Sequence, residues 1–273
     1  MTASLPRADA SVAARAGREI ISLTTNSVTL SPAPADKDFL PGPVLLLGAP
    51  GVGKGTQAKA LMGAYGIPQI STGDILRANI TQASELGIKA KALMDQGQLV
   101  DDDTVNGMVA SRLQEPDVNR GFILDGYPRT RQQAGYIETL LSADRHIIGS
   151  NSSSGLRLPL VAINIVVEED ELLRRITGRR SCVACKHIYN IYSQPPKIAG
   201  VCDFDGSPLA QRSDDTEPAF HERMKEYHAK TREVIQYFSQ KAGQFEIVDG
   251  DHPVQQVTEA IEAALKRLRT SNR

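Results

Sequence analysis

From residue 43 onward, short apolar runs alternate with longer stretches in which apolar residues recur every three or four positions. The short runs predict buried strands at 44–48, 121–125, 160–167 and 245–248. The longer stretches predict amphipathic helices at 84–96, 104–113, 169–176, 217–240 and 253–268. Buried strands separated by helices are typical of a parallel sheet covered on both faces. The pattern therefore predicts an α/β fold whose ligand site lies at the carboxyl ends of the strands.

The first expected strand runs directly into a glycine-rich loop, which reads Gly48-Ala-Pro-Gly-Val-Gly-Lys-Gly-Thr56. Glycines let backbone N–H groups turn inward around an anion, and the lysine and threonine can reach the phosphates and Mg2+ of a nucleoside triphosphate. A glycine-rich turn without a ligand is the alternative, but the spacing G-x4-G-K at a strand-to-helix junction favours nucleotide binding. The residues expected to hold the nucleoside triphosphate here are Gly51, Val52, Gly53, Lys54, Gly55 and Thr56.

Composition excludes several classes of protein. The chain has 273 residues, 41% of them hydrophobic, so it can bury one large α/β core or a core with a small insert. Its net charge of -1 argues against a nucleic-acid or membrane-surface binder, because such proteins carry a basic excess. No apolar run approaches the ~18 residues of a membrane span, so we expect a soluble protein.

The first 42 residues differ in composition from the rest of the chain, because Ser, Thr, Ala and Pro are prominent there. We expect a disordered extension at 1–42; a transit peptide is the alternative, which Asp9 and Glu19 weaken. We therefore expect a cytoplasmic protein, with organelle targeting by this extension left open. A Ser-rich link at 142–158 predicts a flexible surface loop without chemistry.

All three cysteines of the chain fall in one pattern, Cys182-Val-Ala-Cys185 followed after sixteen residues by Cys202-Asp-Phe-Asp205. Two ligand pairs with two-residue spacers suit a tetrahedral zinc ion, and three thiolates with one carboxylate complete its coordination. Such a closed site is structural, because it leaves no position for water. His187 is a substitute ligand that is worse placed than Asp205, and three unpaired small hydrophobes are the remaining interpretation.

Asp125 ends the expected strand at 121–125. A carboxylate at this place can hold Mg2+ through water. The alternative is a turn residue, because the sequence Asp-Gly-Tyr-Pro contains residues that favour turns. We favour the metal role because the placement matches a Walker-B-like carboxylate.

Six motifs follow one another along the chain: GAPGVGKGT at 48–56, STGDILR at 71–77, GQLVDDD at 97–103, GFILDGYPRT at 121–130, RITGRR at 175–180 and VDG at 248–250. In this order they resemble adenylate kinases, from about Pro43 to Leu268. The resemblance implies a P-loop core with a five-stranded parallel sheet flanked by helices, and the reaction ATP + AMP ⇌ 2 ADP with Mg2+. It also implies an AMP-binding helical insert at 71–100 and a small zinc-bearing lid at 178–215, between core segments 43–70, 101–177 and 216–273. We expect a monomer whose partners are ATP and AMP, not nucleic acid or membrane.

The resemblance also assigns roles to single residues. Phosphoryl transfer holds two anionic substrates in line, and planar guanidinium groups bind phosphate oxygens bidentately. The catalytic residues it implies are Lys54, Asp125, Arg129, Arg175, Arg179, Arg212 and Arg223. Those implied for AMP are Thr72, Arg77, Gln98, Leu99, Val100, Gly126, Tyr127, Pro128, Arg129, Gln133, Arg212 and Arg223, with Gln133 reading the base edge. On the ATP side it adds Arg175, Ile188, Tyr189 and His252, the last of which is often Lys or Gln in the family.

The acidic pair Asp214 and Asp215 is expected to orient Arg212 or neighbouring arginines by ion pairing. Three other functions stay open. The same kinase with another nucleotide preference is the first, and a P-loop hydrolase or switch is the second, although the arginine-rich second site argues against a switch. A zinc-ribbon nucleic-acid module is the third, and the net charge argues against it.

Overall fold

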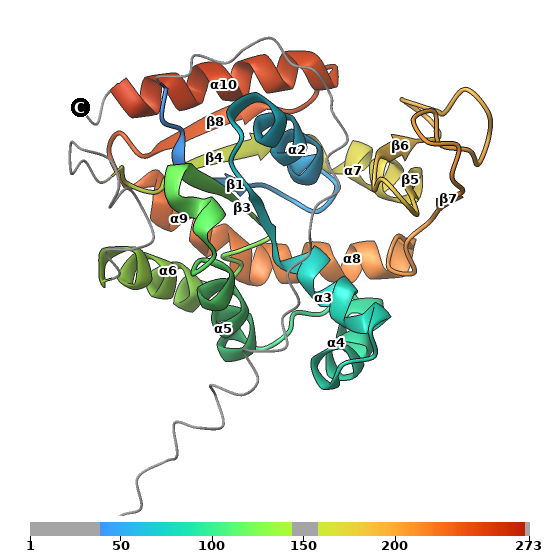
Figure 1. Cartoon of the computed structure of the whole chain (residues 1–273), viewed down its shortest axis with the longest axis horizontal. Helices are drawn as coiled ribbons and strands as arrows, with labels where there is room; N and C mark the ends of the chain where they lie inside the picture. The colour runs from blue at the N-terminus through green and yellow to red at the C-terminus, as the bar shows by residue number, and fades with distance from the viewer. Residues whose placement is uncertain (1–38, 144–157, 271–273) are drawn as a thin grey trace, which may run out of the picture.

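The computed structural model of the chain describes residues 39–143 and 158–270 (Figure 1). Its centre is a sheet of five parallel strands in the order β2-β3-β1-β4-β8. The strands are β1 (Gly42–Leu47), β2 (Gln69–Ser71), β3 (Gly121–Asp125), β4 (Val161–Val166) and β8 (Phe245–Asp249). The predicted five-stranded parallel α/β fold is therefore confirmed. The expectations for the extension at 1–42 and the link at 142–158 fall almost entirely outside the described residues.

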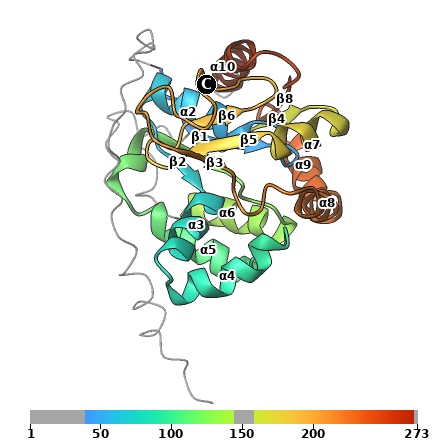
Figure 2. The same cartoon turned by 90° about the vertical axis from the view of Figure 1, so that its right-hand side faces the viewer.

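Helices cover both faces of the sheet (Figures 1 and 2). On one side lie α2 (Lys54–Tyr65) and α10 (Val254–Thr270), and on the other lie α5 (Asp102–Arg112), α6 (Arg131–Ala143) and α9 (Arg232–Ser239). In β1, Val44 and Leu46 belong to the first core, whereas Leu45 and Leu47 belong to the second. A strand that is apolar on both sides is stable only between two layers, which is why its sequence forms a central strand.

Apart from the short turn at 116–120, the remaining helical segments of the core match helices that the sequence pattern predicts, whereas α6 was not predicted. These remaining segments are η1 (Pro116–Arg120), α7 (Glu169–Thr177), α8 (Glu217–Glu226) and the π-helical turn η2 (Tyr227–Thr231) that joins α8 to α9. The helix expected at 217–240 is thus one long segment with a π-turn inside it. The pattern missed β2, because three residues are too few to show a period. Among the helices at 39–143 and 158–270, none is long and apolar enough to cross a membrane.

Two small units stand beside the sheet, on the right in Figure 1. One consists of α3 (Thr72–Thr81) and α4 (Glu85–Asp95), within the stretch expected to bind AMP. The other, within the expected lid, is an antiparallel sheet of β5 (Arg179–Cys182), β6 (Ile188–Asn190) and β7 (Leu209–Ala210), in the order β6-β5-β7. Each unit follows a strand or helix that ends at the carboxyl edge of the main sheet, so both flank that edge.

Arg269, near the end of α10, is buried and ties three chain segments together. Its guanidinium group donates hydrogen bonds to the backbone carbonyls of Pro41 at 2.6 Å, Pro43 at 2.8 Å and Pro159 at 2.7 Å. Burial lowers the pKa of Arg269 to about 10, so the group stays charged at neutral pH. The C-terminal helix therefore fixes the points at which β1 and β4 enter the sheet.

Replacing Arg269 with leucine should lower the free energy of unfolding by about 3 kcal/mol or more, because two buried carbonyls and one half-buried carbonyl lose their donor. Arg267→Leu is the matched control, since Arg267 is 62% exposed and pairs with Glu246 at the surface. Its effect should be much smaller. Urea unfolding followed by circular dichroism measures both variants, and equal losses would contradict the anchoring role of Arg269.

Candidate active site

The loop between β1 and α2 is shaped by its glycines. Gly51 and Gly53 have φ angles of 87° and 101°, in the left-handed region that favours glycine. At Gly48, where φ is 136°, a Cβ atom would lie 2.4 Å from the carbonyl oxygen of Ile165, so the loop can lie against β4 only with glycine there. Helix α2 begins at Lys54, and its positive dipole end therefore faces the loop. This is an anion-binding cradle.

Lys54 spans the cradle, with Nζ donating to the carbonyl oxygens of Gly48 at 2.8 Å and Ala49 at 2.9 Å. Burial lowers the pKa of Lys54 to about 8, and the charge of Asp125 partly opposes this shift. Asp125 Oδ2 accepts a hydrogen bond from Gln69 Nε2 at 2.8 Å and would lie 3.4 Å from a Cβ atom at Gly55. The carboxylate thus faces the first turn of α2.

Five arginines from separate elements gather around this edge of the sheet. They are Arg77 on α3, Arg129 after β3, Arg179 on β5, Arg212 after β7 and Arg223 on α8. Burial and then the charge of Arg223 lower the pKa of Arg129. Burial and the charges of Arg179 and Arg77 lower the pKa of Arg212 to about 10. These mutual effects show that the guanidinium groups lie close enough to repel one another.

Three carboxylates hold the arginines in place. Asp215, whose side chain is fully buried, accepts from Arg179 Nε at 2.8 Å, while Asp214 pairs with Arg223. Burial opposes ionisation of Arg179, but its hydrogen bonds and charge contact with Asp215 raise its pKa. Asp74 pairs with Arg77 and lies 3.7 Å from Arg212 NH2. The acidic pair therefore orients the neighbouring arginines, and Arg212 is held by Asp74 instead.

The four residues expected to bind zinc lie together in the small antiparallel unit. One ligand atom from each of Cys182, Cys185, Cys202 and Asp205 lies within 4.8 Å of all the others. The Sγ atoms of Cys185 and Cys202 are 3.6 Å apart, close to the ~3.8 Å that tetrahedral coordination with Zn–S bonds near 2.3 Å requires. His187 stacks against Tyr189 and Phe204, with ring centroids 4.7 and 4.4 Å away, and stays outside this group. The donor set and its spacing fit a zinc ion.

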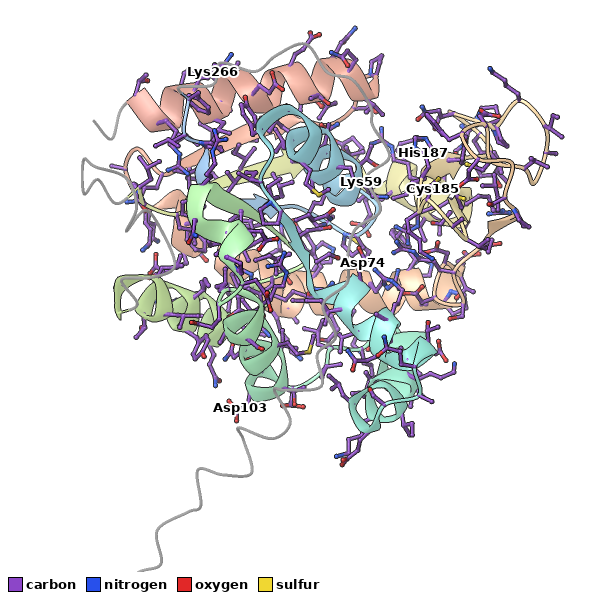
Figure 3. All side chains as sticks on the ribbon, viewed as in Figure 1. Lys59, Asp74, Asp103, Cys185, His187 and Lys266 are labelled. Carbon is purple, nitrogen blue, oxygen red and sulfur yellow. The ribbon has the colours of Figure 1, made fainter. Side chains whose placement is uncertain are left out.

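The small unit of β5, β6 and β7, called the zinc-type unit below, contacts both the core and the α3–α4 unit. Lys59 Nζ on α2 donates to the carbonyl oxygen of Lys186, and Figure 3 shows Lys59 on the side of α2 that faces Cys185 and His187. Ser213 Oγ donates to Asp95 Oδ1 on α4 at 2.9 Å. Together with the Arg212–Asp74 pair, these contacts place the two units against each other across the carboxyl edge.

Comparison with known proteins identifies the family. A family sequence model described as adenylate kinase matches residues 46–243. The chain belongs to the adenylate kinase family. It is 44% identical over 225 residues to the adenylate kinase of Thermodesulfovibrio yellowstonii, covering 82% of this chain and 99% of that protein. Similar matches are the adenylate kinases of Archaeoglobus fulgidus, 43% identical over 227 residues (83% and 99%), and Methanosarcina acetivorans, 44% identical over 225 residues (82% and 99%).

In this member of the adenylate kinase family, most residues expected at AMP line one stretch beside α3. Ser71 Oγ accepts from Asp74 N and caps α3. Thr72 Oγ1 donates to the Gly126 carbonyl at 2.9 Å, as does Arg129 Nε at 2.8 Å. Tyr127, Pro128 and Gln133 are buried next to them. Gln98 is exposed and Leu99 half-buried, but the side chain of Val100 belongs to the hydrophobic core, so only its backbone is left for a nucleotide.

The residues expected at the ATP base are more scattered. Arg175 lies apart from the other arginines and donates to the Gly250 carbonyl and to Asp251 Oδ1, both at 3.1 Å. His252, in the same loop after β8, lies 3.2 Å from Asp249. Tyr189 is buried in the zinc-type unit, where its hydroxyl accepts from Asp203 N at 2.7 Å, so its side chain does not face the cradle. Ile188 and the backbone remain for ATP.

Several residues that shape this adenylate kinase site have no signal in the sequence. Lys59 contacts the lid through a backbone carbonyl, and Gln69 supports Asp125 from a three-residue strand. Asp74 matched a helix-capping pattern, whereas its pairing with two arginines depends on the fold. In the sequence, Asp102 is simply an acidic residue in the first turn of a helix. Its hydrogen bonds to Thr130 and Gln133 are visible only in the structure. Contacts between segments that are far apart in the chain leave no periodic pattern in the local sequence, so the sequence alone does not reveal them.

The pKa of Lys54 should be measurable by NMR titration of 13C-labelled lysine side chains in the nucleotide-free protein. We expect it near 8, against an ordinary value of 10.5, because burial disfavours the charged form. Asp125→Asn should lower it further, since a neighbouring negative charge that favours the ammonium form is removed. An ordinary lysine titration, or an upward shift in Asp125→Asn, would contradict the described environment.

Proposed function

We propose that this chain transfers the terminal phosphoryl group of ATP to AMP, reversibly and with Mg2+, giving two ADP. The observation that carries the proposal is the gathering of Lys54 and five arginines at one edge of the sheet, between the phosphate cradle and the α3–α4 unit. That much positive charge exceeds what one nucleotide needs. Relatives that share 43–44% of their residues with this chain bear the name adenylate kinase, which supports the same activity.

The ATP triphosphate would occupy the cradle. Backbone N–H groups of the loop and the start of α2 would bind its phosphate oxygens, and Lys54 would exchange its two backbone carbonyl partners for phosphate. The negative charge of the phosphate would favour the ammonium form and so oppose the lowering of the Lys54 pKa by burial. Arg175 and the loop at 250–252 would lie toward the base.

AMP would lie beside α3, with its phosphate against Arg77 and Arg129. Its phosphate is already ionised at neutral pH, so no general base is needed. The arginines would shield the charge that spreads over the transferred phosphoryl oxygens, and they would hold the two nucleotides in line. Positioning and electrostatic stabilisation thus account for catalysis.

Mg2+ would enter with ATP. Asp125 faces the first turn of α2, where Thr56 is the residue with a hydroxyl, and these two oxygen donors suit a hard cation that keeps several waters. The metal supplies charge neutralisation between the phosphates. Asp125 and Thr56 would be the residues that hold it in place.

We propose that Cys182, Cys185, Cys202 and Asp205 hold a structural zinc ion. In the small unit only Cys182, Tyr189 and Cys202 form a buried apolar cluster. A core this small does not stabilise a fold by burial alone, so metal binding would supply the folding free energy. The lid at 178–215 could then move as a rigid body against the insert at 71–100 and the core.

Closure of the lid would exclude water from the phosphates, which suppresses hydrolysis of ATP. The Lys59 and Ser213 contacts are the points at which the lid meets the core and α4. A P-loop switch would need no second cluster of arginines, so the site favours the kinase. We further propose that the protein acts as a cytoplasmic monomer in adenylate balance and AMP salvage.

Lys54→Ala and Arg129→Ala should each lower AMP-dependent ADP formation at least ~1000-fold, because each removes a charge that the transition state needs. A coupled assay with ATP and AMP, together with circular dichroism, separates this loss from unfolding. Lys266→Ala is the control, because Lys266 is exposed on α10, far from the cradle (Figure 3). Normal turnover in either site variant would remove that residue from the mechanism.

Metal analysis of the purified protein should find about one zinc per chain. Cys182→Ser should lose the zinc and lower the melting temperature, because a ligand to the lid's stabilising ion is gone. Val183→Ser, at the adjacent and 47% exposed position, is the matched control and should keep the metal. A zinc-free protein of unchanged stability would disprove the metal site.

A further inference from the structure

A partly buried polar network joins the start of α5 to the residues just before and within the first turn of α6. Gln133 Nε2 donates to Asp102 Oδ1 at 2.8 Å, and Gln133 Oε1 accepts from the backbone N–H of Arg129 at 2.7 Å. Thr130 Oγ1 donates to the other oxygen, Asp102 Oδ2, at 2.6 Å and accepts from Gln133 N at 3.1 Å. Gln133 is only 2% exposed. Its carboxamide is therefore held at both ends.

The two partners of the carboxamide dictate one orientation independently. A carboxylate only accepts hydrogen bonds, so it must face the NH2 end of Gln133. A backbone N–H only donates, so it must face the oxygen end. A carboxamide turned by 180° would set its oxygen against Asp102 and its NH2 against Arg129 N–H, which leaves two like contacts in a buried place. The flip is thus excluded by chemistry.

Orientation matters because an unrestrained carboxamide cannot tell two purines apart. On its Watson–Crick edge, adenine presents a donor at N6 and an acceptor at N1, whereas hypoxanthine and guanine present an acceptor at O6 and a donor at N1. A carboxamide has one donor end and one acceptor end, so it matches the first pattern in one orientation and the second after a flip. A fixed orientation matches only one.

We propose that Asp102 is a positioning residue that sets the base preference of the nucleoside monophosphate site by fixing the Gln133 carboxamide. The inference rests on the proposed function and on the role that the family resemblance implies for Gln133, which is to read the base of AMP. Asp102 does not touch the substrate. It acts through Gln133, and Thr130 holds the carboxylate for that purpose. The site would thereby discriminate adenine from 6-oxopurines without a dedicated group against them.

Asp102→Asn tests the proposal, because asparagine presents a donor as readily as an acceptor and the restraint on Gln133 is weakened. The probes are AMP and inosine monophosphate, which differ in the N1 and C6 groups alone. Wild-type protein should prefer AMP strongly, and the ratio of kcat/KM for AMP to that for inosine monophosphate should fall about tenfold in the variant. Where turnover of the inosine nucleotide is too slow, its inhibition constant against AMP gives the ratio. The KM for ATP should not change.

Asp103→Asn is the matched control. Asp103 is the next residue, also in the first turn of α5, and it is exposed at the outer end of that helix (Figure 3). It loses the same charge at the same helix terminus but has no contact with Gln133, so its selectivity ratio should equal that of the wild type. If Asp102→Asn does not fold, Thr130→Val is the second variant; it releases one oxygen of Asp102 and should shift the ratio in the same direction by a smaller factor.

A merely structural role would slow both nucleotides by the same factor and leave the ratio unchanged, which would overturn the inference. So would equal shifts in Asp102→Asn and Asp103→Asn. Failure of the proposed function looks different, because wild-type protein would then form no ADP from ATP and AMP at all. The selectivity ratio is read only from protein that passes that first assay.

Discussion

Positive charge concentrated at one edge of a parallel sheet is the constraint on which this structure depends. Lys54 and five arginines repel one another, and burial adds to the cost, as the lowered pKa values of Lys54 and Arg212 show. Buried or half-buried carboxylates offset part of that repulsion, above all Asp215 with Arg179 and Asp214 with Arg223. The remainder is relieved only by anions. A site of this kind is stabilised by the phosphates that it binds, so affinity for nucleotides and the arrangement of the cations have the same physical origin.

The architecture follows from the need to bring these cations together. Parallel strands end at one edge, so the cradle after β1 and the segment after β3 meet there, as the pairing of Leu46 with Asp125 shows. The inserts supply Arg77, Arg179 and Arg212, and the core supplies Arg129 and Arg223. Asp214 and Asp215, at the junction between the lid and α8, hold arginines from both sides. The charge density at the cradle therefore depends on where both of these units lie.

The lid and the base site show two ways of making a small region rigid. The lid has too little apolar surface for a core of its own, and its donor set fits a metal in place of one. The base site instead uses a closed chain of hydrogen bonds through Asp102, Thr130 and Gln133. In both, full satisfaction of buried polar groups removes alternative conformations.

The sequence by itself predicted most strands and helices of the core and the glycine-rich loop, and it named the four residues that lie together in the lid and the arginines of the family motifs, because these depend on local spacing, turn chemistry or motif order. It left out α6 and also β2, whose three residues show no period, and it could not show that the side chain of Tyr189 is buried in the lid. Only the tertiary structure decided which carboxylate pairs with which arginine, that Arg175 stands apart from the cluster, and that Asp102 holds Gln133. These are contacts between segments far apart in the chain, and they depend on how the layers pack, which no local spacing of residues encodes.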